Sequence, residues 1–324
     1  MNIVVTGSIA YDYLMSFPGD FLDHVKPDRI QKLSLSFLVD DMVKHRGGCA
    51  PNIAYSLALL GERPTVMGTA GEDFEEYRVW LESQGVDTSA IQVIPNVFTA
   101  SFFATTDQAL NQIASFYTGA MAYARTLSFH DFDTPVDLTI ISPNDPEAMA
   151  KYPKECRELG IPYIYDPSQQ VVRASPESLC DGVVGADILV VNDYEYELLK
   201  DRTNMTDAAI RRVVKRAVVV TQGAEGAVIW AGPDRAKKIQ IPPAPPREIA
   251  DPTGVGDAFR AGLIKGIILG LPWAAAGRIG SLAATYVLEA QGPQAHHYTL
   301  TGFLTRYRSI FGDDEATAAL SREL

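Results

Sequence analysis

Asp251-Pro-Thr-Gly-Val-Gly-Asp-Ala-Phe-Arg-Ala-Gly262 is the stretch around which this sequence is organised. Gly254 and Gly256 permit a tight turn and leave backbone amides uncovered. Apolar residues follow, so these amides and those of Val255 and Asp257 are expected on the first turn of a helix, where unpaired N–H groups attract an anion. Asp257 falls in the same turn. The pattern predicts an anion hole for phosphoryl transfer, with a carboxylate placed to take a proton from an attacking hydroxyl.

A plain turn followed by a capping aspartate, worth about 0.3–1 kcal/mol, would give the same string. An aspartate at a helix N-terminus is also expected to be a weak base, so hydroxyl alignment should matter as much as proton removal. Arg260 could reach a phosphate, although a surface ion pair is its more ordinary role. A second glycine-rich turn, Arg46-Gly-Gly-Cys-Ala-Pro-Asn52, opens a helix over residues 53–60 and favours the functional interpretation.

Together the two turns resemble the two signatures of ribokinase-like (PfkB-type) kinases, and the likeness spans nearly the whole chain. The strings SLSFLVDD, NDPEAM and DPSQQ resemble more particularly the adenosine kinases of actinobacterial type. The resemblance implies an α/β protein with the ribokinase-like three-layer αβα fold, a mostly parallel central sheet and a small β-sheet lid. It also implies ATP-dependent phosphorylation of the 5′-hydroxyl of adenosine, with Asp257 as base. A sugar kinase acting on ribose or fructose, and a catalytically inactive nucleoside-binding protein, remain alternatives.

The pattern of strands and helices agrees with this fold, since near-continuous apolar strands alternate with helices, as in a parallel sheet covered on both faces. The expected strands are residues 64–68, 138–142, 163–166, 188–192 and 217–221, and the expected helices 74–83, 146–159, 194–200 and 206–212. We assign residues 1–10, 47–95 and 121–324 to a large nucleotide-binding domain. Residues 11–46 and 96–120 form an inserted β lid, with strands expected at 33–40, 100–106 and 112–117. Residues 313–324 are expected to form a polar surface helix that frays.

Acceptor-binding residues are assigned through the resemblance. Asp12 would accept hydrogen bonds from two vicinal ribose hydroxyls, beside Ser8, the backbone at Gly48, and Asn52. From its position alone, Asp12 could equally be a turn former at the end of a strand.

Aromatic and amide side chains would complete the nucleoside pocket. Phe102 and Phe116 would stack on a base, which contributes about 1–3 kcal/mol per base, although aromatic residues on strands more often form a sheet core. Gln169 and Gln170 follow Asp166-Pro-Ser168 and could hydrogen-bond the base or the sugar. Adjacent residues of an extended chain point opposite ways, so only one of the two glutamines need face the pocket.

Two further motifs concern ATP and its magnesium ion. Asn192-Asp-Tyr-Glu195 resembles the NxxE element of these kinases, with Glu195 organising Mg²⁺ through water. A simple helix cap would use the same residues. The turn after the strand 217–221 resembles the TxGxxG element near the nucleotide, through Thr221, Gly223 and Gly226. Turns between hairpin strands are also glycine-rich.

A monovalent cation, potassium in many relatives, is implied beside the anion hole. Asp251 and Thr253 precede the hole, and Gly292 could supply a carbonyl oxygen. An ordinary capping role for Asp251 is the competing account. The five histidines show no spacing typical of metal ligands, and the pair His296-His297 is expected to be exposed to solvent.

Composition limits the partners and the compartment. The net charge of −12 argues against nucleic acid and anionic membranes, and it leaves capture of ATP to local donors and a metal. No apolar run reaches the ~20 residues of a membrane helix. Three scattered cysteines without CxxC spacing suggest reduced thiols in the cytoplasm. An apolar lid face could pair with a second copy, so a homodimer is expected.

Overall fold

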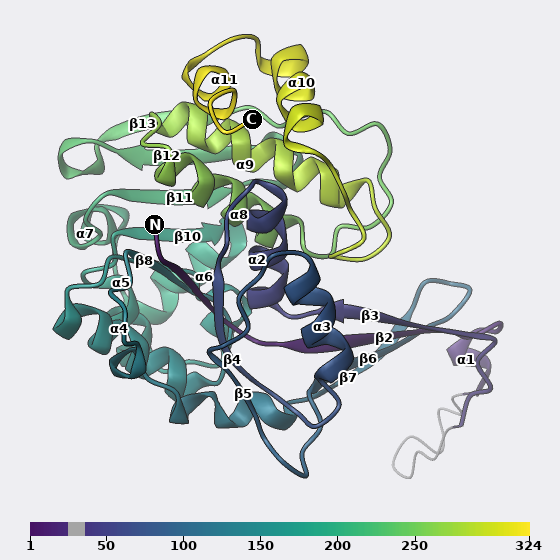
Figure 1. Ribbon diagram of the computed structural model, residues 1–324. Coiled ribbons are helices and arrows are strands. Elements are labelled where there is room, and N and C mark those ends of the chain that lie inside the picture. The colour runs from purple at the N-terminus through teal and green to yellow at the C-terminus, as the bar shows by residue number, and fades with distance from the viewer. Residues whose placement is uncertain (25–35) are drawn as a thin grey trace.

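The computed structural model describes residues 1–24 and 36–324, and its core is a nine-stranded sheet in the order β13-β12-β11-β10-β9-β8-β1-β4-β5 (Figure 1). In this order, the seven strands from β11 to β5 pair parallel with one another. β12 pairs antiparallel with β11, and β13 antiparallel with β12. The bounds are β1 (Ile3–Thr6), β4 (Thr65–Ala70), β5 (Ile91–Val93), β8 (Leu138–Ile141), β9 (Tyr163–Tyr165), β10 (Ile188–Asn192), β11 (Ala217–Thr221), β12 (Ala227–Ala231) and β13 (Lys237–Ile241).

Helices cover both faces of this sheet, because its strands are apolar on both sides. Val4 of β1 packs into one core and Val5 into the other, as the alternation of a strand requires. The core that holds Val5 is closed by α2 (Cys49–Leu59), α3 (Glu75–Ser83), α8 (Val255–Ile268) and α9 (Trp273–Leu288). The core that holds Val4 is closed by α4 (Pro146–Leu159), α5 (Pro176–Val183), α6 (Asp193–Thr203) and α7 (Asp207–Val213). The expected three-layer architecture is confirmed.

A separate four-stranded sheet, in the order β3-β2-β6-β7, projects from the side of the main body (Figure 1). It consists of β2 (Ala10–Ser16), β3 (Asp41–Gly47), β6 (Ala100–Thr106) and β7 (Gln112–Tyr117), with the short α1 (Phe21–His24) near its tip. The strand expected at 33–40 is wrong in its described part, and residues 33–35 lie outside the described residues. Ser16, the last residue of β2, pairs with Asp41, so residues 36–40 have no partner strand along which to continue.

The C-terminal segment corrects another expectation. α10 (Leu300–Phe311) and α11 (Glu315–Leu320) pack against α9, and four of the six residues of α11 are buried. Asp314 caps α11 and also pairs with Arg278 of α9 at 3.0 Å. The tail is therefore an integral helix of the fold and not a fraying surface helix. Among the helices of the described part, none has the length and apolar character needed to cross a bilayer.

Candidate active site

A cavity of about 1070 Å³ lies where β10 and β11 end and also reaches the small sheet. Nearly all of the side chains and turns singled out in the sequence line it. They are Ser8, Asp12, Gly48, Asn52, Phe102, Phe116, Gln169, Asn192, Glu195, Thr221, Gly223, Gly226, Thr253, Gly254, Val255, Gly256 and Asp257. Gln170, Asp251 and Gly292 are not among its lining residues.

The first turn of α8 presents open backbone donors to this cavity. Gly254 is the N-cap, at φ 82°, and no side chain caps the helix. Within the described residues, the amides of Gly254, Gly256 and Asp257 have no hydrogen-bond acceptor, whereas the amide of Val255 donates to the carbonyl of Pro252 at 3.3 Å. Three of the four amides assigned to the anion hole are therefore free to hold an anion.

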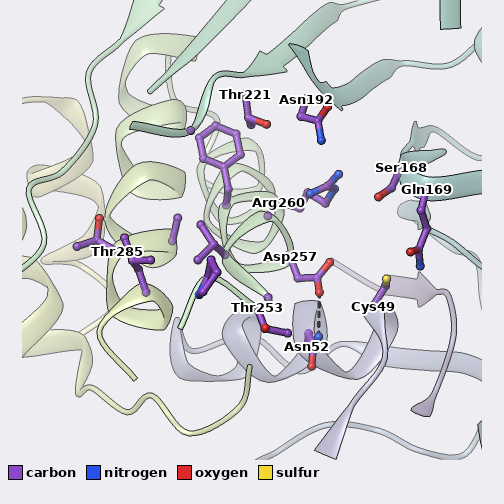
Figure 2. A pocket seen from close by; sticks show the side chains of 18 of the residues that line it. Cys49, Asn52, Ser168, Gln169, Asn192, Thr221, Thr253, Asp257, Arg260 and Thr285 are labelled. Atoms are coloured by element: carbon purple, nitrogen blue, oxygen red, sulfur yellow. Dashed lines mark hydrogen bonds between the residues drawn. The ribbon is translucent and has the colours of Figure 1, made fainter. Parts of the chain in front are cut away.

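Asp257 lies in this turn and contacts Asn52 of the other glycine-rich turn, residues 46–52. Its Oδ2 accepts a hydrogen bond of 2.9 Å from Nδ2 of Asn52 on α2 (Figure 2). Burial raises the pKa of Asp257 to about 7, against the opposing effects of Arg260 and of the hydrogen bond from Asn52. A weak base was expected from the helix N-terminus alone, and burial has the opposite effect, because desolvation disfavours the charged form of the carboxyl. A carboxylate with a pKa near 7 suits general-base catalysis at neutral pH.

Arg260 adds a positive charge to the same wall. The expected surface ion pair is instead a buried one, because Nη2 of Arg260 lies 2.5 Å from Oδ1 of Asp166, with both side chains almost fully buried. Oδ2 of Asp166 accepts from the hydroxyl of Ser142 at 3.0 Å. Figure 2 shows Arg260 between Asp257 and the strand ends that carry Asn192 and Thr221. The guanidinium is thus held where an anionic phosphate could meet it.

The small sheet supplies an aromatic wall at one end of the cavity. Asp12 of β2 pairs with Phe102 of β6, and Phe102 pairs with Phe116 of β7, so all three side chains are on the same face of this sheet. Both phenylalanines are partly exposed and line the cavity, and neither lies in a closed lid core. Burial, together with the charge of Asp251, raises the pKa of Asp12 to about 6.

The side chains of the two adjacent glutamines, Gln169 and Gln170, lie in different environments. They lie in a short 3-10 turn, Ser168–Val172, in which Gln169 is exposed to the cavity. Gln170 is buried, and its Nε2 donates to the carbonyl of Asn144 at 2.9 Å. The assignment of Gln170 to the substrate pocket is wrong, because successive residues of the turn point in different directions.

The opposite end of the cavity is apolar. The turn with Thr221, Gly223 and Gly226 lies at this end and is closed by a hydrogen bond from Gln222 N to Gly226 O of 2.8 Å. Further lining residues of this end were not singled out in the sequence and are mostly apolar: Pro243, Ala244, Pro245, Pro246, Ile249, Ala284 and Leu288, with Ser281 and Thr285. No sequence signal marks them, because ordinary core helices and loops use the same small apolar residues. Such a wall fits the flat ring of a nucleotide base.

Asn192 and Glu195 form a capping box at the start of α6, which confirms the capping interpretation of their geometry. Asn192 Oδ1 accepts from Glu195 N at 2.7 Å, and Glu195 Oε2 accepts from Asn192 N at 2.8 Å. Glu195 Oε1 also accepts from the hydroxyl of Ser168 at 3.2 Å. The described residues contain no cluster of three potential metal ligands. This donor set fits a magnesium ion held on substrate phosphates, with Glu195 contributing through water.

Asp251 accepts two hydrogen bonds, one within its own loop and one from the loop that contains Gly292. Its Oδ1 accepts from the amide of Thr253 at 2.8 Å and its Oδ2 from the amide of Gly292 at 3.0 Å. Gly292 therefore faces Asp251 with its N–H group, and not with the carbonyl expected for a cation site.

His296 was expected to be exposed, but its side chain is only 3% exposed, and its Nε2 lies 3.3 Å from the hydroxyl of Ser56. Burial lowers the pKa of His296 to about 4.

Comparison with known proteins fits this geometry. Residues 9–299 match the pfkB family of carbohydrate kinases. The chain belongs to this family. A nucleoside kinase of Methanothermobacter thermautotrophicus is 30% identical over 303 residues, 91% of this chain and 92% of the relative. The nucleoside kinase of Burkholderia thailandensis, solved with inosine, is 36% identical with a TM-score of 0.85, covering 96% of this chain and 98% of that chain.

The sequence likeness to one adenosine kinase covers a shorter stretch of the chain. Adenosine kinase 1 of Arabidopsis thaliana is 33% identical, but only over 78 residues, 24% of this chain and 22% of the relative. The comparisons therefore place the chain among kinases that phosphorylate a hydroxyl of a nucleoside or a sugar.

Proposed function

We propose that this protein is an ATP-dependent nucleoside kinase that transfers the γ-phosphate to the 5′-hydroxyl of a purine nucleoside, adenosine foremost. The observation that carries the proposal is the pairing of Phe102 with Phe116 beside Asp12 on one wall of the cavity. A base needs such an aromatic surface, whereas a free sugar does not. The inosine complex of the Burkholderia relative supports a purine nucleoside as acceptor.

The acceptor and the nucleotide would occupy opposite ends of the cavity. The nucleoside would stack on Phe102 and Phe116, and its vicinal ribose hydroxyls would donate to Asp12. The base of ATP would lie along the apolar wall that includes Pro243 and Leu288. Both molecules would then meet at the first turn of α8, which lies between the two ends. The Burkholderia relative has also been solved with ADP and inosine, which supports binding of both a nucleotide and a nucleoside.

Asp257 and the amides of α8 would carry the chemistry. The oxygen of the 5′-hydroxyl attacks the γ-phosphorus, its proton passes to Oδ1 of Asp257, and the bond to the β,γ-bridging oxygen breaks to release ADP. Oδ1 is free for this role because only Oδ2 accepts a hydrogen bond within the described residues. The amides of Gly256 and Asp257, with the guanidinium of Arg260, would stabilise the charge on the transferred group. Magnesium, held near Glu195, would neutralise the phosphates of ATP.

A panel of acceptors tests the proposal. Adenosine, inosine, cytidine, ribose and fructose are each assayed with ATP and Mg²⁺, with and without K⁺. We expect kcat/KM for the purine nucleosides to exceed that for either sugar by about 100-fold or more, because the sugars cannot use the aromatic wall. Turnover of a sugar without turnover of any nucleoside would reject the assignment. Stimulation by K⁺ would support a cation beside Asp251, and equal rates would reject it.

We also propose a homodimer formed through the small sheet, acting in the cytoplasm. All six residues of β7 are exposed, among them the apolar Ile113 and Tyr117. A strand edge of this kind is commonly covered by a second chain. Light scattering after size exclusion should give twice the mass of the chain, and Ile113→Lys should reduce it to that of a monomer. A native chain that elutes as a monomer would contradict the dimer.

A further inference from the structure

Gln294 is a buried side chain in the segment between α9 and α10, outside the lining of the cavity. Its Nε2 donates to Oδ1 of Asn52 at 2.7 Å and to the hydroxyl of Tyr77 at 2.6 Å. Tyr77, fully buried on α3, donates in turn to the carbonyl of Gly47 at 3.0 Å. With the hydrogen bond from Asn52 to Asp257, these contacts form one chain from the base of the small sheet to the candidate catalytic carboxylate.

This series of hydrogen bonds is consistent with only one orientation of the Asn52 and Gln294 amides when Asp257 is ionised. An ionised carboxylate can only accept, so Asn52 must face Asp257 with its Nδ2 and turn its Oδ1 toward Gln294. That oxygen can only accept, so Gln294 must present its amide nitrogen. The second N–H of this nitrogen goes to Tyr77, whose own proton goes to Gly47. This orientation leaves the Oε1 of Gln294 buried without a hydrogen-bond partner in the described part of the chain, which costs the free energy of desolvating that oxygen.

We propose that Gln294 is a positioning residue, which fixes the Asn52 amide so that it donates to Oδ2 of Asp257 and leaves Oδ1 free for the acceptor proton. The inference rests on the proposed kinase mechanism. If the amide of Asn52 rotated, its Oδ1 would face the carboxylate, and Asp257 would hold its proton more tightly. Gln294 would thus control the fraction of Asp257 that is ionised without touching any substrate.

Other charged groups also face Asp257, and a test must leave them unchanged. Arg260 lies on the same helix, Asp166 follows β9, Asp12 lies on β2, and the thiol of Cys49 lies on α2. Within the described residues, Gln294 makes no hydrogen bond to any of these four side chains. An uncharged substitute therefore acts on Asp257 through Asn52 alone, whereas a glutamate also adds a negative charge nearby.

Two variants are compared. Gln294→Met removes both N–H donors without adding charge, and Gln294→Glu keeps the size of the side chain but replaces the amide with a carboxylate. The new carboxylate would draw Nδ2 of Asn52 toward itself and turn Oδ1 to Asp257. We expect the pKa of Asp257 to rise by about one unit. The ionised fraction at neutral pH, and with it kcat, should then fall about fivefold, with KM for ATP unchanged and kcat recovering at higher pH. Gln291→Glu is the matched control, since it adds the same charge to an exposed residue of the same segment.

The experiment is a ¹³C NMR titration of the Asp257 carboxyl in the substrate-free chain, assigned by its loss in Asp257→Asn. An upward shift in both Gln294→Met and Gln294→Glu, but not in Gln291→Glu, supports the inference. Equal titration in wild type and Gln294→Glu overturns it. Gln294→Met removes the same donors without adding charge, and it also serves should Gln294→Glu fail to fold. An unchanged titration in Gln294→Met overturns the inference even where Gln294→Glu shifts, because the added charge by itself can raise the pKa. Because no substrate is present, this result is independent of the acceptor panel that tests the proposed function.

Discussion

Nδ2 of Asn52 lies 2.9 Å from Oδ2 of Asp257, although the two residues are 205 positions apart in the sequence. Asn52 comes from the glycine-rich turn that opens α2, and Asp257 from the one that opens α8. The hydrogen bond joins the two signatures at a single carboxylate and holds one of its oxygens. The other oxygen remains available to an acceptor hydroxyl, which is the arrangement that a general base requires.

Replacement of this carboxylate should separate catalysis from binding. Asp257→Asn is expected to lower kcat by about 10²–10⁴-fold, because it removes the proton acceptor. Nucleoside affinity, measured by calorimetry, should change little, since Asp12, Phe102 and Phe116 remain. A variant with native turnover would remove Asp257 from the mechanism.

The pH dependence of activity follows from the two raised pKa values. Burial raises the pKa of Asp257 to about 7 and that of Asp12 to about 6. Asp257 must be ionised to take a proton, and Asp12 must be ionised to accept from two ribose hydroxyls with both of its oxygens. Activity should therefore be low in acid and rise as the pH increases through both values. We expect kcat/KM, measured from about pH 5 to about pH 9, to level off above about pH 8. A flat profile across this range would contradict the assignment of Asp257 as base.

The anion hole depends on the left-handed conformation of Gly254. Gly254 has φ +82°, and a Cβ there would lie 2.7 Å from Cβ of Pro293. Gly254→Ala should shift the first turn of α8 and lower kcat/KM by about 10²-fold, as expected when oxyanion donors are displaced. Gly270→Ala is the control, because Gly270 also has positive φ but nothing lies within 4 Å of its Cβ position. Equal kinetic losses in the two variants would show that backbone strain, and not the anion hole, is responsible.

The aromatic wall should be specific for nucleosides. Phe102→Ala is expected to raise KM for adenosine about 10- to 100-fold, which corresponds to the loss of one stacking contact of about 1–3 kcal/mol. KM for ATP should not change, because the nucleotide occupies the other end of the cavity. Phe103→Ala serves as control, since Phe103 stacks on Tyr13 and does not line the cavity. If the two variants have the same KM for adenosine, Phe102 does not bind the base.

Local sequence patterns predicted the central parallel strands of the main sheet and several of its helices, but not the strands β5, β12 and β13 at its two ends. The strands 188–192 and 217–221 and the helix 146–159 have the expected bounds, because each apolar run ends where a cap or turn residue begins. The strand expected at 33–40 was wrong over its described residues, 36–40, since a strand on the edge of a small sheet is set by the length of its partner β2 and not by its own composition. The fraying tail was wrong for a related reason: α11 becomes buried only through contacts with α9, far away in the sequence.

The candidate site could be predicted where the chemistry is carried by glycine turns and charged side chains. It could not be predicted where distant segments contribute single polar groups. The ion pair of Arg260 with Asp166 and the contact of Gln294 with Asn52 both join segments more than ninety residues apart. No local sequence pattern predicts the partner of a single glutamine or arginine. The desolvation that raises the pKa of Asp257 likewise arises only when the domain is assembled.

The most direct test is the identification of the products formed by the purified chain from adenosine, ATP and Mg²⁺. ³¹P NMR should show ADP and adenosine 5′-monophosphate in equal amounts, and neither product in the Asp257→Asn variant. Release of inorganic phosphate in place of the monophosphate, or phosphorylation of ribose but of no nucleoside, would contradict the account.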